Sequence, residues 1–308
     1  MNKTYRNEDN LKQAVEMLAD RQSISNMCHM RLSGEPLPSQ QAVKSIIDLT
    51  RMILFPGFFG SEGVNSYNLE YVIGIRCEEL NNILTNQITA ALALQKGCSE
   101  EIDLPRLEKQ AADLSVRLIS QLPEMRRVLH TDVSAIYRGD PAAASHEEVI
   151  YCYPSIRAIT NHRIAHALHV MGVPVLPRMI SEMAHSETGI DIHPGATIGE
   201  YFAIDHGTGV VIGATAIIGK NVKIYQGVTL GAKSFDCDPE GNPIKGIARH
   251  PIIGDDVVIY SNASILGRIT IGNGAVIGGN IWVTEDVAPG EKLTQAKANN
   301  ILRFKQDI

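Results

Sequence analysis

The chain has 308 residues, which is enough for about two domains. Hydrophobic residues make up 44% and charged residues 20%, as is ordinary for globular proteins with a sizeable core. The net charge of −6 excludes the strongly basic balance of proteins that bind nucleic acid or anionic membranes, so we expect neither as a partner.

Two further properties concern the cellular compartment. No window approaches about 18 uninterrupted apolar residues, and the first residues are polar, so we expect neither a membrane span nor a signal peptide. The five cysteines are odd in number and include no CxxC pair. They indicate reduced thiols in a cytoplasmic protein rather than a disulfide framework.

The first part of the chain has the spacing of amphipathic helices. Apolar residues recur at helical steps within 11–18, 83–92 and 107–122. A further helix is expected over 156–171, because a Gly-Val-Pro sequence follows it. We therefore predict an all-α domain over residues 1–185.

Beyond that domain an aliphatic residue recurs every six positions. This period fits neither a helix nor a single strand. It is typical of a parallel β-helix, in which three short faces form a triangular coil of about 18 residues around an aliphatic column. The residues that keep the period are Ile192, Ile198, Ile204, Val210, Ile212, Ile218, Ile224, Leu230, Ile253, Ile259, Ile265, Ile271, Ile277 and Val283. We expect the β-helix over 186–290 and a polar tail without periodicity over 291–308.

The period is first broken between Ile204 and Ile212, where the step is eight residues. This break contains Asp205 and His206, followed by glycines that would let both side chains face outward. A histidine, with an ordinary pKa of about 6.5, suits a general base. Asp191 would lie on the neighbouring turn, where its carboxylate could orient the imidazole. Alternatively, the Asp-His pair only closes a turn.

The second break is a long polar insertion between residues 230 and 253, which should project as a loop. It opens with Gly231 and Ala232, whose small size would permit close approach of a pantetheine or phosphate group. It ends with Arg249 and His250. Arginine can bind a carboxylate through two hydrogen bonds, and the histidine could bind a substrate oxygen. The alternative is a solvated loop.

Three outward histidines raise the possibility of a zinc site. Zinc would need His193, His206 and His250 to converge at about 2.0–2.1 Å. Their spacing does not place them side by side on one face, so we expect no metal and regard His193 as structural.

Three segments together resemble a known family. The runs DIHPGATIGEYFAIDHGTGVVIG, VTLGA and ARHPIIGDDVVI are similar to the catalytic domain of serine O-acetyltransferases, hexapeptide-repeat enzymes of cysteine biosynthesis. The upstream IYRGDPAA and NHRIAHAL resemble the helical domain of that family. The similarity covers about residues 132–289. It implies a left-handed coil and transfer of the acetyl group of acetyl-CoA to the hydroxyl of L-serine.

The resemblance also implies roles for single residues. His206 would be the general base and Asp191 its partner. The residues implied to bind the amino-acid substrate are Asp140, Asp205, Arg249 and His250. The residues implied to bind acetyl-CoA are Gly231, Ala232 and Ser261.

The chain departs from the family pattern at three places. It has Gly231-Ala232-Lys233-Ser234 where the family commonly has Gly-Gly-Thr-Gly-Lys. It has Ala214 where a glutamate is common, and the loop before Arg249 is longer. The first difference concerns the contact with CoA, the second removes any supporting role of that carboxylate, and the third concerns closure over the substrate.

The resemblance further implies partners. Family members form homotrimers, or dimers of trimers through the helical domain, with active sites between neighbouring β-helices. A terminal isoleucine, Ile308 here, often enters the active site of O-acetylserine sulfhydrylase. Two other functions remain open from the sequence: acetylation of a different hydroxyl acceptor, and a non-catalytic scaffold for cysteine synthase.

Overall fold

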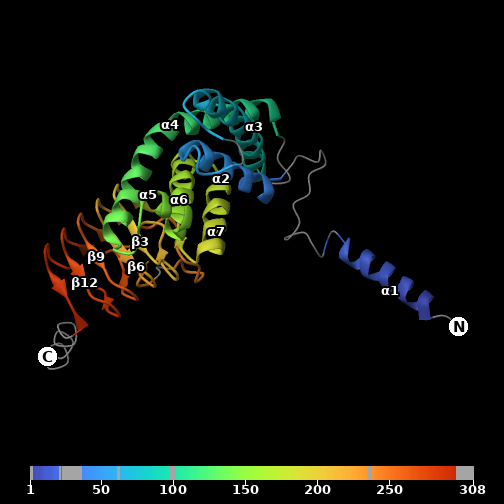
Figure 1. Ribbon diagram of the computed structural model, residues 1–308. Helices are drawn as coiled ribbons and strands as arrows, with labels where there is room; N and C mark the ends of the chain where they lie inside the picture. Colours follow the sequence, from blue (N-terminus) through green and yellow to red (C-terminus); the bar gives the residue numbers. More distant parts are fainter. Residues whose placement is uncertain are drawn as a thin grey trace.

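The computed structural model describes residues 3–20, 22, 37–60, 63–96, 102–234 and 237–295. Figure 1 shows a helical part followed by a coil of short strands. The expected fold class, an all-α part followed by a parallel β-helix, is confirmed. The helices of the described part are α1 (Lys3–Leu18), α2 (Gln40–Leu54), α3 (Leu69–Gln95), α4 (Leu104–Gly139), α5 (His146–Cys152), α6 (Pro154–Val170) and α7 (Leu176–Thr188).

Helix α4 is much longer than the apolar stripe that predicted it. It begins after Asp103, whose side chain accepts a hydrogen bond from the backbone N–H of Arg106, as an N-cap residue does. It continues over 36 residues, through Pro123, to Gly139. The next residue is Asp140, so the end of this helix delivers one of the predicted substrate-binding residues.

Helix α7 extends beyond the predicted domain boundary at residue 185. It ends at Thr188, because Gly189 has a left-handed conformation with φ of 70° and its N–H bonds back to the carbonyl of His185. The first strand begins at Asp191, two residues after this glycine. A glycine C-cap thus makes the transition from helix to coil.

The coil consists of three parallel sheets. Each turn contributes one strand to each sheet, except that the last turn adds only an isolated bridge at Val287 to the second. The first sheet has the order β1-β4-β7-β10-β13, the second β11-β8-β5-β2 and the third β14-β12-β9-β6-β3. The strands are β1 (Asp191–Ile192), β2 (Thr197–Ile198), β3 (Ala203–Asp205), β4 (Val211–Ile212), β5 (Ile217–Ile218), β6 (Lys223–Tyr225), β7 (Thr229–Gly231), β8 (Ile252–Ile253), β9 (Val258–Ile259), β10 (Ser264–Leu266), β11 (Thr270–Ile271), β12 (Val276–Ile277), β13 (Trp282–Val283) and β14 (Lys292–Leu293).

The strand register locates both breaks in the period. Val211 pairs with Thr229, so a regular turn takes 18 residues. Asp191 pairs with Val211, which makes the first turn 20 residues long. Thr229 pairs with Ser264, 35 residues later, so the second break inserts 17 residues into one turn. The strands above and below both breaks remain in register.

The predicted aliphatic column forms the interior of the coil, since every residue that keeps the six-residue period is buried. Each such side chain contributes about 1.5–3 kcal/mol by leaving water. The coil continues past the predicted end at residue 290, because β14 pairs with β12 and Leu293 is buried. Residues 296–308, with Ile308, lie outside the described residues.

The helical part and the coil share one continuous hydrophobic core. A buried ion pair holds them together: the carboxylate of Asp132 in α4 accepts hydrogen bonds from Nε and Nη2 of Arg163 in α6, at 2.7 and 2.9 Å. The same carboxylate accepts the backbone N–H of Phe202 in the coil at 2.9 Å. Arg163 also donates to the carbonyl oxygen of Gly199. The helices therefore fix the first turn, which carries the first break.

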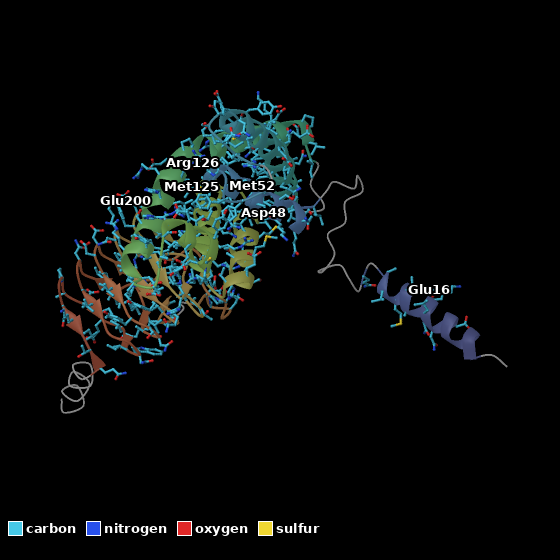
Figure 2. All side chains as sticks on the ribbon, in the orientation of Figure 1. Glu16, Asp48, Met52, Met125, Arg126 and Glu200 are labelled. Carbon is cyan, nitrogen blue, oxygen red and sulfur yellow. The ribbon has the colours of Figure 1, made fainter. Side chains whose placement is uncertain are left out.

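A surface group reinforces this junction. Glu200, labelled in Figure 2, lies beside α4 and accepts hydrogen bonds from Arg127 of that helix and from Lys220 of the next turn, both at 3.0 Å.

Among the helices of the described part, none is long and apolar enough to cross a bilayer.

Candidate active site

The predicted site residues of the coil fall mainly at two of its corners. The turns between the third and first sheets, here called the His206 corner, are residues 206–210, 226–228, 260–263 and 278–281. The turns between the first and second sheets, here called the Arg249 corner, include residues 193–196, 213–216 and the described parts of 232–251. A triangular coil keeps its corners apart, so the two groups are separate within one chain.

His206 projects from its corner into solvent. Its side chain is 77% exposed, and its Nε2 lies 3.8 Å from Oδ1 of Asp205. The turn is left-handed at His206 itself, with φ of 57°, and again at Gly207. A Cβ on Gly207 would lie 2.5 Å from Cδ1 of Ile190, so the tight corner requires glycine there. The backbone thus holds the imidazole outward in a sparsely populated conformation, as is common at functional sites.

Two carboxylates lie near this imidazole. Asp205 forms an ion pair with Lys223, whose Nζ is 2.9 Å from Oδ2. The same ammonium donates to the carbonyl oxygen of Gly139 at 2.6 Å and so joins the coil to the end of α4. Asp140 follows directly. The sequence analysis missed Lys223, because an isolated lysine beside a core isoleucine carries no distinctive pattern.

Asp140 is held by its own hydrogen bonds. Its Oδ2 accepts the hydroxyl of Tyr153 at 2.5 Å, and its Oδ1 accepts the N–H of Ala142 at 2.8 Å. The hydrogen bond from Tyr153 and then that from Ala142 hold the pKa of Asp140 below its ordinary value, with smaller contributions from Lys223 and His206. Asp140 is therefore a carboxylate near neutral pH. Tyr153 is a second residue that the sequence analysis missed.

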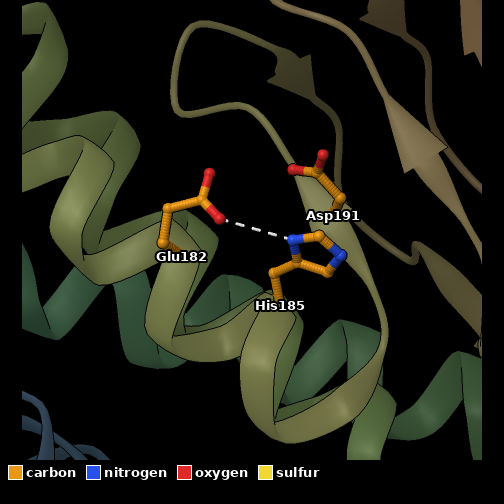
Figure 3. A group of neighbouring side chains, drawn as sticks. All are labelled: Glu182, His185 and Asp191. Carbon is orange, nitrogen blue, oxygen red and sulfur yellow. Dashed lines mark hydrogen bonds and ion pairs between the residues drawn. The ribbon is translucent and has the colours of Figure 1, made fainter.

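Asp191 lies on β1 and pairs with Val211 of β4, the strand that begins directly after residues 206–210. Within the described residues, no hydrogen bond or ion pair joins its carboxylate to His206. Figure 3 shows it beside Glu182 and His185 of α7. One carboxylate oxygen of Asp191, one of Glu182 and one ring nitrogen of His185 all lie within 4.8 Å of one another. His185 Nδ1 lies 3.3 Å from Glu182. The role of Asp191 as partner of the base remains a prediction.

His250 is buried at the Arg249 corner, with 6% exposure. Its ring occupies the space beside Gly213, where a Cβ would lie 2.0 Å from the imidazole Cδ2. Burial, followed by the charge of Arg249 and contributions from His193 and Arg268, lowers the pKa of His250 to about 4. His250 is therefore neutral near pH 7 and can donate one hydrogen bond.

The three histidines considered for zinc do not meet. His193 lies at the Arg249 corner, where its Nδ1 accepts the N–H of Gly195 at 2.9 Å and its ring meets the edge of His169. Burial is the main cause that lowers the pKa of His193. Since His206 lies at the other corner, the three imidazoles do not converge within one chain.

The residues predicted to bind acetyl-CoA divide between the corners. Gly231 ends β7 beside Leu266, whose Cδ2 would lie 2.9 Å from an added Cβ. Ala232 follows it into the Arg249 corner. Ser261 lies at the His206 corner, where its carbonyl oxygen accepts the N–H of Asn280. Each corner thus carries part of the predicted site.

The sequence is similar to curated acetyltransferases. The family described as bacterial transferase hexapeptide (six repeats) matches residues 250–280. A plasmid serine acetyltransferase of Synechococcus elongatus is 50% identical over 280 residues, which cover 89% of this chain and 88% of the relative. The serine acetyltransferase of Bacillus subtilis is 48% identical over 161 residues, 52% of this chain and 70% of the relative.

Solved structures of serine acetyltransferases are also similar to this chain. Serine acetyltransferase 1 of Entamoeba histolytica, in complex with L-cysteine, has a TM-score of 0.71 at 37% identity and covers 81% of this chain and 86% of its own. The Neisseria gonorrhoeae enzyme in complex with serine has a TM-score of 0.53 at 29% identity, with 82% and 94% covered. With half of its residues shared along most of the length of the Synechococcus protein, the chain belongs to the serine acetyltransferase family of acyltransferase enzymes.

Proposed function

We propose that the protein transfers the acetyl group of acetyl-CoA to the hydroxyl of L-serine, giving O-acetyl-L-serine and CoA in cysteine biosynthesis. The observation that carries the proposal is the chemistry of the two corners. Asp140 and Asp205 lie near an outward imidazole at the His206 corner. Arg249 and the neutral His250 lie at the other. An amino acid needs acidic groups for its ammonium and a guanidinium for its carboxylate.

His206 takes the proton of the serine hydroxyl as that oxygen attacks the thioester carbonyl. A carbon–oxygen bond forms, the carbonyl oxygen becomes an oxyanion, and His250 donates a hydrogen bond to a substrate oxygen. The carbon–sulfur bond then breaks. The imidazolium returns its proton to the CoA thiolate, so the base is regenerated. Asp191 orients His206 in this proposal.

The remaining contacts follow from position. Arg249 binds the serine carboxylate, while Asp140 and Asp205 bind the ammonium. Gly231, Ala232 and Ser261 bind acetyl-CoA, the first two through their small size and backbone N–H groups. The fit of these residues to CoA rests on Gly231, which a side chain would bring against Leu266.

The two corners can act together only if the His206 corner of one chain faces the Arg249 corner of a second chain. A cyclic homotrimer provides such a contact, because a head-to-tail interface closes into a ring. We therefore place each active site between two neighbouring coils. Assembly as a dimer of trimers through the helices, and a contact of Ile308 with O-acetylserine sulfhydrylase, belong to the same proposal.

The function is tested by release of the CoA thiol from acetyl-CoA with L-serine, L-homoserine or a galactoside as acceptor. Serine-dependent release, with little release for the other acceptors, is expected. Release only with another acceptor would replace serine in the proposal. Absence of release with every acceptor would favour a non-catalytic scaffold.

A further inference from the structure

The turn that carries His250 is held by a threonine from the turn before it. Thr215 Oγ1 accepts the backbone N–H groups of Arg249 and His250, at 2.9 and 3.2 Å. The same oxygen lies 2.8 Å from Nδ1 of His250. The backbone N–H of Thr215 also donates to this Nδ1, at 3.1 Å. One hydroxyl therefore contacts the imidazole and both backbone groups that position it.

The direction of each hydrogen bond follows from the groups involved. A backbone N–H can only donate, so Nδ1 of His250 is an acceptor and carries no proton. The two N–H groups that reach the threonine hydroxyl occupy its lone pairs, so its hydrogen points to Nδ1. The proton of the neutral imidazole is then on Nε2.

The Nε2 edge packs against Gly213, and the missing side chain makes room for the ring, since an added Cβ would lie 2.1 Å from Nε2. Within the described residues, Nε2 makes no hydrogen bond and is not sealed from solvent. The charged and titratable groups around the ring are Arg249, His193 and Arg268, all of which disfavour the imidazolium. Arg268 also donates to the carbonyl oxygens of Thr215 and His250, at 2.7 and 2.9 Å, so it ties the two turns together.

We infer that Thr215 is a positioning residue, whose hydroxyl fixes the orientation and tautomer of His250 so that Nε2–H is presented to a substrate oxygen. This inference rests on the proposed acetyl transfer. Thr215 touches no reacting atom in it and acts through the imidazole. Valine has nearly the shape of threonine but lacks the hydroxyl, whereas serine keeps it.

The experiment measures kcat and KM for serine in Thr215→Val, Thr215→Ser and the control Thr197→Val. Thr197 is an exposed threonine of β2 whose side chain makes no hydrogen bond within the described part of the chain. We expect Thr215→Val to lower kcat/KM for serine by about 10- to 100-fold, less than the loss of an oxyanion donor itself. Thr215→Ser should stay within about threefold of the parent, and Thr197→Val should not change.

A double-mutant cycle separates positioning from a general structural role. If Thr215 acts through the imidazole, Thr215→Val should cost little in a His250→Asn background. Losses that multiply in the double variant, or a serine variant no better than valine, would overturn the inference. If Thr215→Val does not assemble, Thr215→Ala replaces it in the same cycle. A parent protein without serine-dependent thiol release would instead refute the proposed function.

Discussion

His206 combines exposure, a left-handed backbone and a position beside two carboxylates. The left-handed conformation disfavours most side chains, but asparagine adopts it readily. His206 can therefore be replaced by asparagine without straining the turn. This makes His206→Asn a cleaner probe of the base than alanine.

We predict that His206→Asn lowers kcat by at least about 100-fold, because asparagine cannot accept the hydroxyl proton. The melting temperature and the oligomeric size should match those of the parent, since the turn is preserved. The measurement is thiol release under saturating serine and acetyl-CoA. Activity close to that of the parent would remove His206 from the role of base.

A second prediction at this scale concerns the stability contributed by His250. Its folded-state pKa of about 4 lies below the ordinary value near 6.5. Between these pH values the imidazole binds a proton in the unfolded chain but not in the folded chain. The stability contributed by His250 is therefore fully present above pH 6.5 and is lost as pH falls toward 4. The free energy of unfolding should decrease over this window by at most about 3 kcal/mol from this group.

The measurement is denaturant unfolding at several pH values between 4 and 7, compared with His250→Gln. The variant has no imidazole to titrate at this position, so its stability should fall less steeply with decreasing pH. Parallel slopes for the two proteins would show that His250 is not the group responsible.

At the scale of elements, the ion pair of Asp132 and Arg163 connects α4, α6 and the first turn of the coil. Asp132 is fully buried and the side chain of Arg163 is 11% exposed. Burial of two charges is costly, and the geometry offsets this cost only while both partners and the backbone bonds are present. The main role of the pair is therefore to fix the position of α4 and α6 against the first turn of the coil.

We predict that Asp132→Ala destabilises the protein by about 3–5 kcal/mol, because it leaves a buried guanidinium without its carboxylate. Glu124→Ala is the matched control. It removes an acidic partner of Arg127 in the same helix, but both side chains of that pair are more than half exposed. Its cost should be at most about 1 kcal/mol. Equal losses of unfolding free energy in the two variants would contradict this reading of the junction.

At the scale of the whole molecule, the division of the site between two corners leads to a test by complementation. If the protein forms the proposed homotrimer, His206→Ala and Arg249→Ala should each be inactive on their own. If each site joins the His206 corner of one chain to the Arg249 corner of its neighbour, mixed trimers contain some interfaces with both residues intact. Because the interface is head-to-tail, each mixed trimer contains about one such interface in three.

The two variants, with different affinity tags, would be produced together and the mixed trimers purified through both tags. Recovery of thiol release toward a third of the parent value is expected. Complete absence of activity in verified mixed trimers would place the site within one chain. Separately purified and briefly mixed variants serve as the control, because their subunits should not exchange.

The six-residue period was sufficient to predict the coil, because an aliphatic residue at every sixth position can be buried only if the chain turns at that interval. Its two breaks also identified His206 and the loop before Arg249 as places outside the regular scaffold. Both conclusions depend on local spacing, which the sequence contains. The length of α4 and the end of α7 were less predictable, since α4 continues through Pro123 and a glycine cap ends α7.

Only the tertiary structure brought Lys223 to the carbonyl of Gly139, Tyr153 to Asp140, and Thr215 to His250. The first and third pairs are separated by 84 and 35 residues, and no local pattern marks them. Such contacts depend on where helices pack and on how an inserted loop returns to its turn. The sequence by itself thus determined the repeat and where it is broken, while long-range packing decided which groups surround each catalytic candidate and that they lie at separate corners.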